Sequence, residues 1–345
     1  MFDIITIGSA TRDAFMRSKD FRVVSDAAAA TGRSLALSLG AKLEIHDLVF
    51  TTGGGATNTA VTFSRQGFKT ATVCAVGDDV AGLAVIEELK REGIETRFVR
   101  RVPRHPTGYS VLLHPAEGGE RTVLVYRGAS EAIVWAHEAR PEFRTRWFYI
   151  SSVAGNLPLL GRILAFAQRE KVFVAYNPGG KELAQRDRLI PFLRKVHVLI
   201  VNREEAALIT RAPFEREREI FRKWDELTPG FNINVMTDGQ NGVMVSDGRM
   251  FYRAGVYREK TIVDRTGAGD AFGSGFVAGL MRGLEKSGTE IAGLAPDAIE
   301  RAIRLGTANA TAKVEGVGAK YGLLSRAQFE RGPRWRGLHI ERTAL

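Results

Sequence analysis

An alternation of short β-branched segments with longer helical patterns constrains the fold of this chain more than any other feature. Six segments have strand character: 3–8, 70–76, 146–151, 171–176, 197–201 and 232–237. Helical patterns lie between several of them, at 56–66, 80–92, 158–170, 181–195 and 203–223. Strand, helix and strand repeated in this way predict an α/β fold, in which a mostly parallel central sheet is covered by helices on both faces. At 345 residues the chain is long enough to bury such a core.

Two segments interrupt the alternation. Residues 11–50 follow the first strand without an obvious parallel partner, and residues 94–127 contain three β-rich pieces, "ETRFVRR", "TGYSVLLH" and "ERTVLVY". The turn-like "PAEGG" separates the last two, so we expect a small antiparallel sheet, inserted in the α/β domain, that could cover a cleft as a lid. The resulting domain assignment is as follows: an α/β core at 1–10, 51–93 and 128–330, an inserted β lid at 11–50 and 94–127, and a basic C-terminal tail at 331–345.

The composition narrows the classes of function. The formal net charge is +10, but the basic residues are dispersed, with local clusters only at 99–105 and 331–342. Because there is no zinc-finger spacing and no repeated basic and aromatic pattern, a field that attracts anionic small molecules explains the charge better than nucleic-acid binding. No uncharged apolar run approaches the roughly 18 residues of a membrane span. The single cysteine, Cys74, excludes an internal disulfide and is interpreted as a buried structural thiol. We expect a cytoplasmic protein with neither a membrane nor a nucleic-acid partner.

The stretch "DRTGAGDAFGSGF" (264–276) places three small residues directly before an aspartate. A sharp turn followed by a helix is expected here, so Gly267, Ala268 and Gly269 would lie at a helix N-terminus. Unpaired backbone N–H groups at such an end, together with the helix dipole, favour an anion such as phosphate. Asp270 is then explained as a general base that takes a proton from an attacking hydroxyl. The alternative is a glycine-capped turn in which Asp270 is an ordinary first-turn residue.

A second glycine cluster, "TTGGGATNTAVTFSRQGFKTATVCAVGDD" (51–79), precedes a helix expected from about Ala56. Gly53 and Gly54 allow a polyhydroxylated ligand to approach the backbone, and Asn58 offers both a donor and an acceptor. The cluster does not match the dinucleotide pattern GxGxxG, because Asn58 stands where the last glycine would be. A Walker-type phosphate loop is also absent, so an ATP site in this chain would use another architecture.

These two clusters, in this order, resemble the paired signatures of the ribokinase-like family, also called the PfkB carbohydrate kinases. The resemblance extends from the region of Asp13 to about residue 320. It implies a ribokinase-like three-layer sandwich with a mostly parallel central sheet and a small antiparallel β lid. It also implies an ATP-dependent phosphotransferase with an alcohol group as acceptor, with Mg²⁺ as a cofactor and K⁺ left open as a second.

The resemblance assigns the acceptor side of the site by matching position. Asp270 would be the catalytic base, with the backbone at 267–269 as an anion hole. Asp13, in "GSATRD", corresponds to the family's substrate-hydroxyl aspartate, and Gly53, Gly54 and Asn58 match other substrate contacts. The alternative for Asp13 is that it only caps the end of the first strand.

The resemblance also assigns a nucleotide side. In "NREEA" (202–206), Asn202 would lie near the phosphates and Glu205 would organise Mg²⁺ through water. In "TDGQNGV" (237–243), the residues that approach ATP would be Thr237, Gly239 and Gly242. The structural alternative for Asn202 and Glu205 is a helix cap and a surface charge.

Two further positions complete the assignment. Asn309 falls where the family contacts the adenine, and its alternative is a buried, hydrogen-bonded residue of an alanine-rich helix. Asp264, with carbonyls near Val314 and Gly318, resembles a monovalent-cation site that orders the anion hole.

Departures from the ribokinase pattern bear on the substrate. Thr11 and Gly55 stand where ribokinases proper carry asparagine and lysine, which puts ribose in doubt. The segment between Asp13 and Gly53 is longer than in ribokinases, as it is in nucleoside kinases and several bacterial sugar kinases. Arg127, at the end of a lid strand, lies near where some members contact an acidic sugar, and its alternative is a salt-bridged surface arginine.

The expected function is transfer of the γ-phosphoryl group of ATP to a hydroxyl, expected to be primary, of a small sugar. The main alternative is a nucleoside kinase of the same family, which needs a more aromatic pocket than Phe15 and Phe50 supply. A catalytically silent sugar- or nucleotide-binding regulator is the other alternative, and the intact Asp270 argues against it. Lids in this family often pair, so a homodimer through the lid is expected.

Overall fold

The computed structural model describes residues 1–29, 31–116, 121–136, 140–228, 232–287 and 291–344. Within these residues a central sheet has nine strands in the order β17-β16-β15-β14-β13-β12-β11-β1-β6. Their bounds are Ile340–Ala344, Met250–Ala254, Val243–Ser246, Ile233–Thr237, Val198–Asn202, Phe173–Tyr176, Thr145–Ile150, Phe2–Ile7 and Thr70–Val73. The strands from β14 to β6 pair in parallel, and β14 to β17 pair antiparallel. The mostly parallel central sheet expected from the alternation is therefore confirmed.

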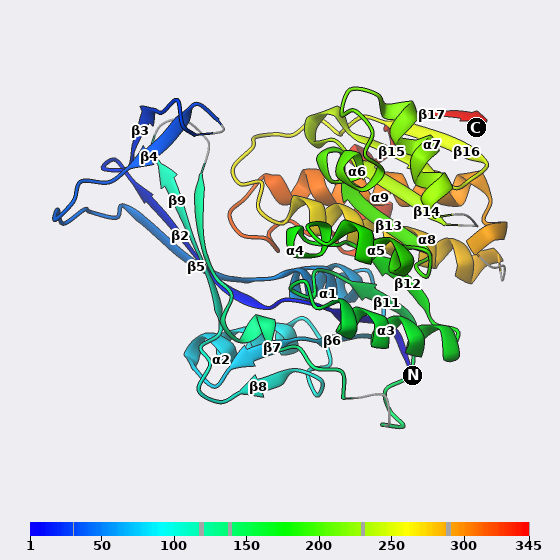
Figure 1. Ribbon diagram of the computed structural model, residues 1–345, viewed down its shortest axis with the longest axis horizontal. Helices are drawn as coiled ribbons and strands as arrows, with labels where there is room; N and C mark the ends of the chain where they lie inside the picture. Colours follow the sequence, from blue (N-terminus) through cyan, green and yellow to red (C-terminus); the bar gives the residue numbers. More distant parts are fainter. Residues whose placement is uncertain (30, 117–120, 137–139, 229–231, 288–290, 345) are drawn as a thin grey trace.

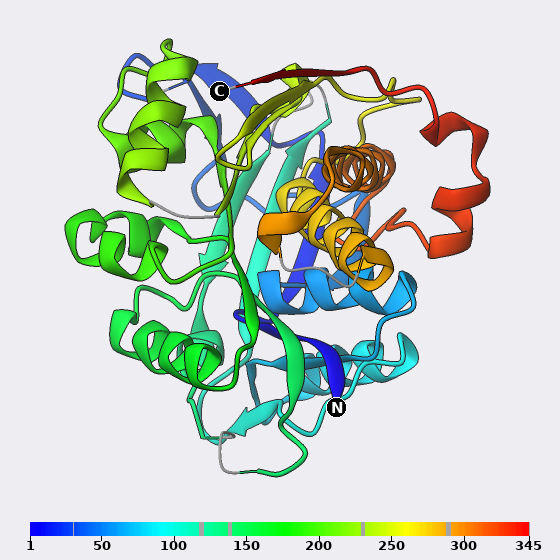
Figure 2. The same ribbon diagram turned by 90° about the vertical axis from the view of Figure 1, so that its right-hand side faces the viewer.

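Helices cover both faces of this sheet (Figure 2). One face carries α3 (Leu157–Arg169), α4 (Gly180–Leu183), α5 (Arg186–Leu193), α6 (Arg203–Thr210) and α7 (Glu217–Leu227). The other face carries α1 (Gly55–Arg65), α8 (Ala268–Ser287) and α9 (Pro296–Val314). The remaining helices are α2 (Val80–Arg91), which shares a buried apolar cluster with α1, and α10 (Arg326–Arg331). Of the helices within the described residues, none is both long and apolar enough to cross a membrane.

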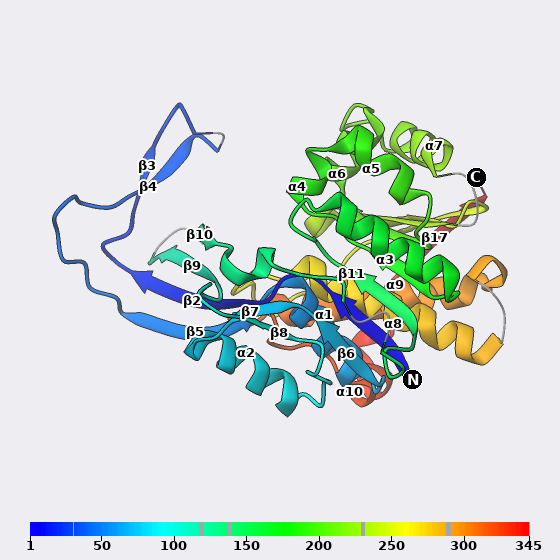
Figure 3. The same cartoon turned by 60° about the horizontal axis from the view of Figure 1, so that its bottom comes forward.

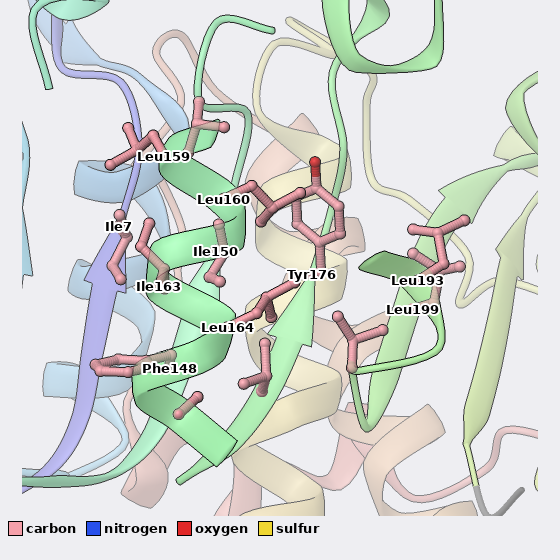
Figure 4. Close-up of a cluster of buried hydrophobic side chains, with 14 of the residues drawn as sticks. Ile7, Phe148, Ile150, Leu159, Leu160, Ile163, Leu164, Tyr176, Leu193 and Leu199 are labelled. Carbon is pink, nitrogen blue, oxygen red and sulfur yellow. The ribbon is translucent and has the colours of Figure 1, made fainter. Parts of the chain in front are cut away.

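The packing of α3 shows how local sequence sets this layering. The helix starts at an N-cap, where Asn156 Oδ1 accepts the N–H of Leu159 at 3.0 Å, and Pro158 in the first turn has no N–H to satisfy. One apolar stripe then faces the sheet, and each fully buried aliphatic side chain in it contributes about 1.5–3 kcal/mol. The stripe and the strand residues beneath it are drawn in Figure 4: Leu159, Leu160, Ile163 and Leu164 on the helix, over Ile7, Phe148, Ile150, Tyr176 and Leu199.

A separate four-stranded sheet projects from one end of the core (Figures 1 and 3). Its order is β10-β9-β2-β5, with bounds Thr122–Tyr126, Gly108–Pro115, Thr11–Ser18 and Asp47–Gly53. A hairpin of β3 (Arg22–Ser25) and β4 (Arg33–Ala36) extends it. Two pairings in the four-stranded sheet are antiparallel, and β2 pairs with β9 in parallel. We call this four-stranded sheet with its hairpin the lid.

Three details differ from the sequence expectation. The piece "ETRFVRR" is not in the lid, because β8 (Arg100–Val102) pairs in parallel with β7 (Ala75–Gly77), which continues from β6. The pattern at 203–223 is two helices, since α6 ends at Thr210, the next residue Arg211 is left-handed (φ 53°), and Pro213 cannot continue the helix. The pattern at 181–195 is likewise divided, into α4 and α5.

The C-terminal segment is the largest correction. Residues 331–345 were expected to be a basic tail, but β17 forms the edge strand of the central sheet beside β16. Its side chains are mostly exposed, so the segment has no apolar alternation that could reveal a strand. Part of the expected "PAEGG" turn, residues 117–119, and residue 345 lie outside the described residues.

Candidate active site

The late glycine motif forms a tight turn into α8. Gly267 adopts φ 77°, and a Cβ there would lie 2.7 Å from the Cβ of Ala319, so only glycine fits. The turn is fixed by Asp264, whose Oδ1 accepts the N–H of Thr266 at 2.9 Å. The amide of Ala268 donates to the carbonyl of Arg265 at 3.2 Å, whereas a Cβ at Gly269 would meet no atom within 4 Å. The start of α8 is therefore open to a ligand at Gly269.

The early glycine cluster joins the lid strand β5 to α1. A Cβ at Gly53 would overlap the Asp13 carboxylate, and one at Gly54, which has φ 95°, would lie 2.5 Å from the carbonyl oxygen of Ser9. A Cβ at Gly55 would lie 2.6 Å from the hydroxyl oxygen of Ser151. The three glycines therefore let this backbone pass directly beside Asp13 and the first strand.

Asn58 connects the two glycine motifs. Its Nδ2 donates to Asp270 Oδ2 at 2.8 Å, across 212 residues of sequence. Its Oδ1 is buried and has no hydrogen-bond partner within the described part of the chain. Because a buried acceptor without a partner is costly, a hydrogen bond donated to this atom by a ligand would be favourable.

Two carboxylates share this site. Burial raises the pKa of Asp270, the charge of Asp13 raises it further, and Asn58 and Lys320 oppose the change. Burial also raises the pKa of Asp13, although Thr11 donates to its Oδ1 at 2.9 Å. Like charges close together in a poorly solvated site favour protonation, which makes either carboxylate a better proton acceptor than a free aspartate.

Lys320 is a site residue that sequence reasoning missed. Its ammonium group is buried, donates to Thr52 Oγ1, and lies 3.1 Å from Glu88 Oε2. Its positive charge acts on both Asp13 and Asp270. The one signal available was a lysine within the small-residue run "GVGAKYG".

A cavity of about 280 Å³ lies beside the N-terminus of α8. It is lined by the strand β14 and the loop after it, the loop before α8, and one face of α9. The lining residues include Thr237, Gly239, Gly242, Val256, Ile262, Ala268, Gly269, Phe272, Thr307, Ala310, Thr311 and Val314. Three of the predicted nucleotide contacts, Thr237, Gly239 and Gly242, therefore line the same cavity as Ala268 and Gly269 of the predicted anion hole.

Asn309 is not among these lining residues, which contradicts its expected contact with adenine. The side chain is fully buried between three helices, with Nδ2 donating to Thr62 Oγ1 at 3.1 Å and to the carbonyl of Ala271 at 2.8 Å. Its Oδ1 accepts the N–H of Leu324 at 2.8 Å. Asn309 is therefore the buried, hydrogen-bonded helix residue of the alternative interpretation. The α9 residues that do line the cavity lie within one turn of it, at Thr307, Ala310 and Thr311.

Asn202 and Glu205 form a capping box at the start of α6. Asn202 Oδ1 accepts the N–H of Glu205, and Glu205 Oε2 accepts the N–H of Asn202, both at 2.9 Å. Burial raises the pKa of Glu205. Asn202 is paired in register with Thr237 of the neighbouring strand, so the box lies at the strand ends beside the cavity. The helix-cap alternative is thus correct for Asn202, whereas Glu205 is a partly buried member of the same box and not the surface charge of that alternative.

Arg127 forms an ion pair at the surface. Its guanidinium is about half exposed and lies 3.7 Å from Glu131, which is similarly exposed. The expected contact with an acidic sugar is therefore not supported, and the alternative of a surface ion pair describes what is found.

Asp264 lies in a buried ion pair. Lys313 Nζ lies 3.3 Å from its Oδ2, and the N–H of Gly318 donates to the same oxygen at 3.1 Å. Burial opposes ionisation, but Lys313, Thr266 and Gly318 outweigh it, so the pKa of Asp264 is lowered.

A second cavity of about 270 Å³ lies between the lid and the loops that precede α8 and follow α9. Its lining residues are Phe15, Met16, Arg17, Asp47, Val49, His114, Val263 and Val317. The rings of Phe15 and His114 stack with centroids 6.0 Å apart. Phe15 follows Asp13 by two positions on β2, so both side chains face the same side of the lid. This cavity therefore includes a side chain from the face of β2 that carries Asp13.

Comparisons with known proteins bear on the family and the fold of this chain. The model of the pfkB family of carbohydrate kinases matches residues 3–326. The ribokinase of Haemophilus influenzae is 26% identical over 283 residues, covering 80% of this chain and 85% of that protein. The cytidine kinase of Thermococcus kodakarensis is 28% identical over 239 residues, covering 67% of this chain and 81% of that protein. The structure of Arabidopsis thaliana ribokinase complexed with ribose and ATP is similar in fold, with a TM-score of 0.77 at 18% identity, covering 97% of this chain and 99% of that chain.

Proposed function

The chain belongs to the pfkB family of carbohydrate kinases, and with it to the ATP-dependent kinases of alcohol acceptors, and we propose that it phosphorylates a primary hydroxyl of a small sugar. The observation that carries this proposal is Asn58, which donates to Asp270 while its own Oδ1 has no partner within the described residues. If one hydroxyl of the sugar donates to Asn58 Oδ1, a neighbouring hydroxyl of the same sugar would lie next to Asp270 as the acceptor. A carboxylate of raised pKa in that position suits the work of a general base.

In this mechanism the acceptor hydroxyl loses its proton to Asp270 as its oxygen forms a bond to the γ-phosphorus of ATP. The bond between that phosphorus and the bridging oxygen breaks, and ADP leaves with the electron pair. The charge that develops on the transferred phosphoryl group would be met at the N-terminus of α8, which is open at Gly269. Asp13 would orient the acceptor, and Lys320 would offset the charge of the two carboxylates.

The cavity beside α8 would hold the nucleotide, with Thr237, Gly239 and Gly242 on one wall and Thr307 on another. Mg²⁺, which would neutralise phosphate charge, fits this edge through the Glu205 carboxylate, because carboxylate oxygens suit this ion. Among the described residues no cluster of three or more histidine, cysteine or acidic side chains could hold a metal ion. Glu205 would therefore act through water, on an ion held mainly by phosphates.

A nucleoside is the second candidate acceptor, and the lid cavity favours it. A sugar bound at Asp13 leaves the cavity beside Phe15 and His114 for a further group, and stacked rings suit a planar base. Phe50, by contrast, is about half exposed and has Arg12 over its ring, so it contributes to another surface.

We further propose a homodimer through the lid, in a cytoplasmic enzyme. Every residue of β10 is exposed, and four of its five side chains are apolar, at Val123 to Tyr126. On β5, the three consecutive side chains Leu48 to Phe50 are exposed as well. Apolar side chains on both edge strands of a projecting sheet support burial against a second copy.

A screen of ADP release tests the function. Pentoses, hexoses, acidic sugars and nucleosides are offered with MgATP, and Asp270→Asn is compared with the wild type on the best acceptor. We expect the variant to bind both substrates while the turnover number falls by about 10²–10⁴. Asp187→Asn, at an exposed surface ion pair, is the matched control and should keep full activity. Near-normal turnover by Asp270→Asn would exclude Asp270 as the base.

A further inference from the structure

The family resemblance predicts a monovalent cation beside Asp264, so the donor groups at that position decide whether an ion fits. Potassium is held in proteins where several carbonyl oxygens replace its hydration shell. The carbonyl of Val314 instead accepts the amides of Val263, at 2.8 Å, and Asp264, at 3.3 Å. Gly318 presents its N–H to Asp264 Oδ2, rather than an oxygen to an ion.

Lys313 fills the remaining space. It lies in the last turn of α9, and its side chain is fully buried. Its Nζ donates to the main-chain carbonyl of Asp264 at 2.6 Å and lies 3.3 Å from Oδ2 of the same residue. One ammonium group thus contacts both the carbonyl and the carboxylate that a bound cation would use.

The charge around Asp264 is also already balanced. The guanidinium of Arg121, the residue before β10 of the lid, lies 3.9 Å from Asp264 Oδ1. With Lys313 on one carboxylate oxygen and Arg121 near the other, a further cation at this carboxylate would be repelled by two positive charges. The residues present therefore do not fit a potassium ion.

We propose that Lys313 is a built-in replacement for the monovalent cation, so that phosphoryl transfer by this chain is independent of added potassium. The ammonium group fixes Asp264, whose Oδ1 fixes the amide of Thr266, and Thr266 leads directly into Gly267 at the start of α8. Lys313 is in this sense a positioning residue for the anion hole, and the inference rests on the proposed function of residues 267–269.

The first experiment uses the unmodified protein. Phosphoryl transfer and the thermal midpoint of the nucleotide-free protein are each measured in potassium chloride, sodium chloride and choline chloride at equal ionic strength. We expect the same rate and the same midpoint in all three salts. Potassium stimulation of the rate by about fivefold or more, the lower end of ordinary coupling between sites, would overturn the proposal.

Two variants at the same position sharpen the test. Lys313→Ala removes the ammonium group and opens space beside Asp264, whereas Lys313→Met removes the charge but keeps the stem. We expect both to lose activity in choline chloride, and potassium chloride to restore the rate and raise the midpoint of Lys313→Ala only. A folded Lys313→Ala protein that responds to potassium no more than the wild type contradicts the proposal.

The readouts keep the two hypotheses apart. If no acceptor is phosphorylated in any salt, the proposed function fails, while the midpoints in potassium and choline chloride still test the role of Lys313. If neither variant folds, the wild-type comparison of rate and midpoint decides by itself.

Discussion

Replacement of Asn309 by alanine tests whether this residue holds helices together or binds nucleotide. Asn309 on α9 donates to Thr62 on α1 and to the Ala271 carbonyl on α8, and it accepts the N–H of Leu324. All three hydrogen bonds are inside the protein, because the side chain is fully buried. The variant cannot make any of them.

The expected cost follows from these contacts. The N–H of Leu324 would be left buried without an acceptor, at about 1–3 kcal/mol, and each of the two lost donated bonds adds about 1 kcal/mol. The sum is about 3–5 kcal/mol. An unfolding entropy of about 2.1 cal/mol/K per residue over 345 residues is about 0.7 kcal/mol/K, so the thermal midpoint should fall by about 4–7 °C.

The assay pairs thermal unfolding of the nucleotide-free protein with calorimetric titration of ATP. We expect Asn309→Ala to lower the midpoint and leave the dissociation constant for ATP unchanged within about twofold. Thr307→Val is the matched control, because Thr307 lines the cavity and its Oγ1 has no partner within the described residues. That variant should keep its midpoint and bind ATP about three- to tenfold more weakly. An unchanged midpoint with much weaker ATP binding in Asn309→Ala would refute the reasoning.

Three other predictions concern the carboxylate site and its surroundings. Because the base must be ionised and burial raises the pKa of Asp270, kcat/KM should fall as pH decreases, with a midpoint above the ordinary aspartate value of 3.8; a flat profile down to that pH would contradict it. Gly53→Ala would place a Cβ against the Asp13 carboxylate and 2.9 Å from Thr11 Oγ1, so kcat/KM for the acceptor should fall about hundredfold in steady-state assays. Burial raises the pKa of Cys74 to about 12, so a thiol reagent at pH 8 should modify it only after unfolding in denaturant, and rapid labelling of the native protein would show that the thiol is accessible.

Much of the fold was predictable because its signals are local. The alternation of strand-like and helical periods predicted the parallel core, since each element's period is set by its own residues and by burial on both faces. The segments that were predicted wrongly are those whose secondary structure depends on a partner that is distant in sequence. Exposed residues 340–344 become a strand only because β16 offers an unpaired edge, and Arg100–Val102 leaves the lid because β7 lies beside it.

In the candidate site, too, some features could be predicted from local sequence and others were found only in the structure. Gly54 and Gly267 could be singled out from sequence, because a close backbone approach or a positive φ excludes other residues. Asn58 and Asp270 followed from the glycine motifs around them, but their hydrogen bond spans 212 residues and had to be found in the structure.

The sequence by itself therefore determined the architecture and the two glycine motifs of the site, since backbone conformation and periodicity are set by neighbouring residues. Tertiary structure alone decided that Lys313 is paired with Asp264, that Lys320 lies against Glu88, and that Asn309 faces the helix junction. The physical reason is that the environment of a buried polar side chain is made by segments remote in sequence. A local sequence pattern does not predict which remote group will pair with the charge of a buried side chain or complete its hydrogen bonds.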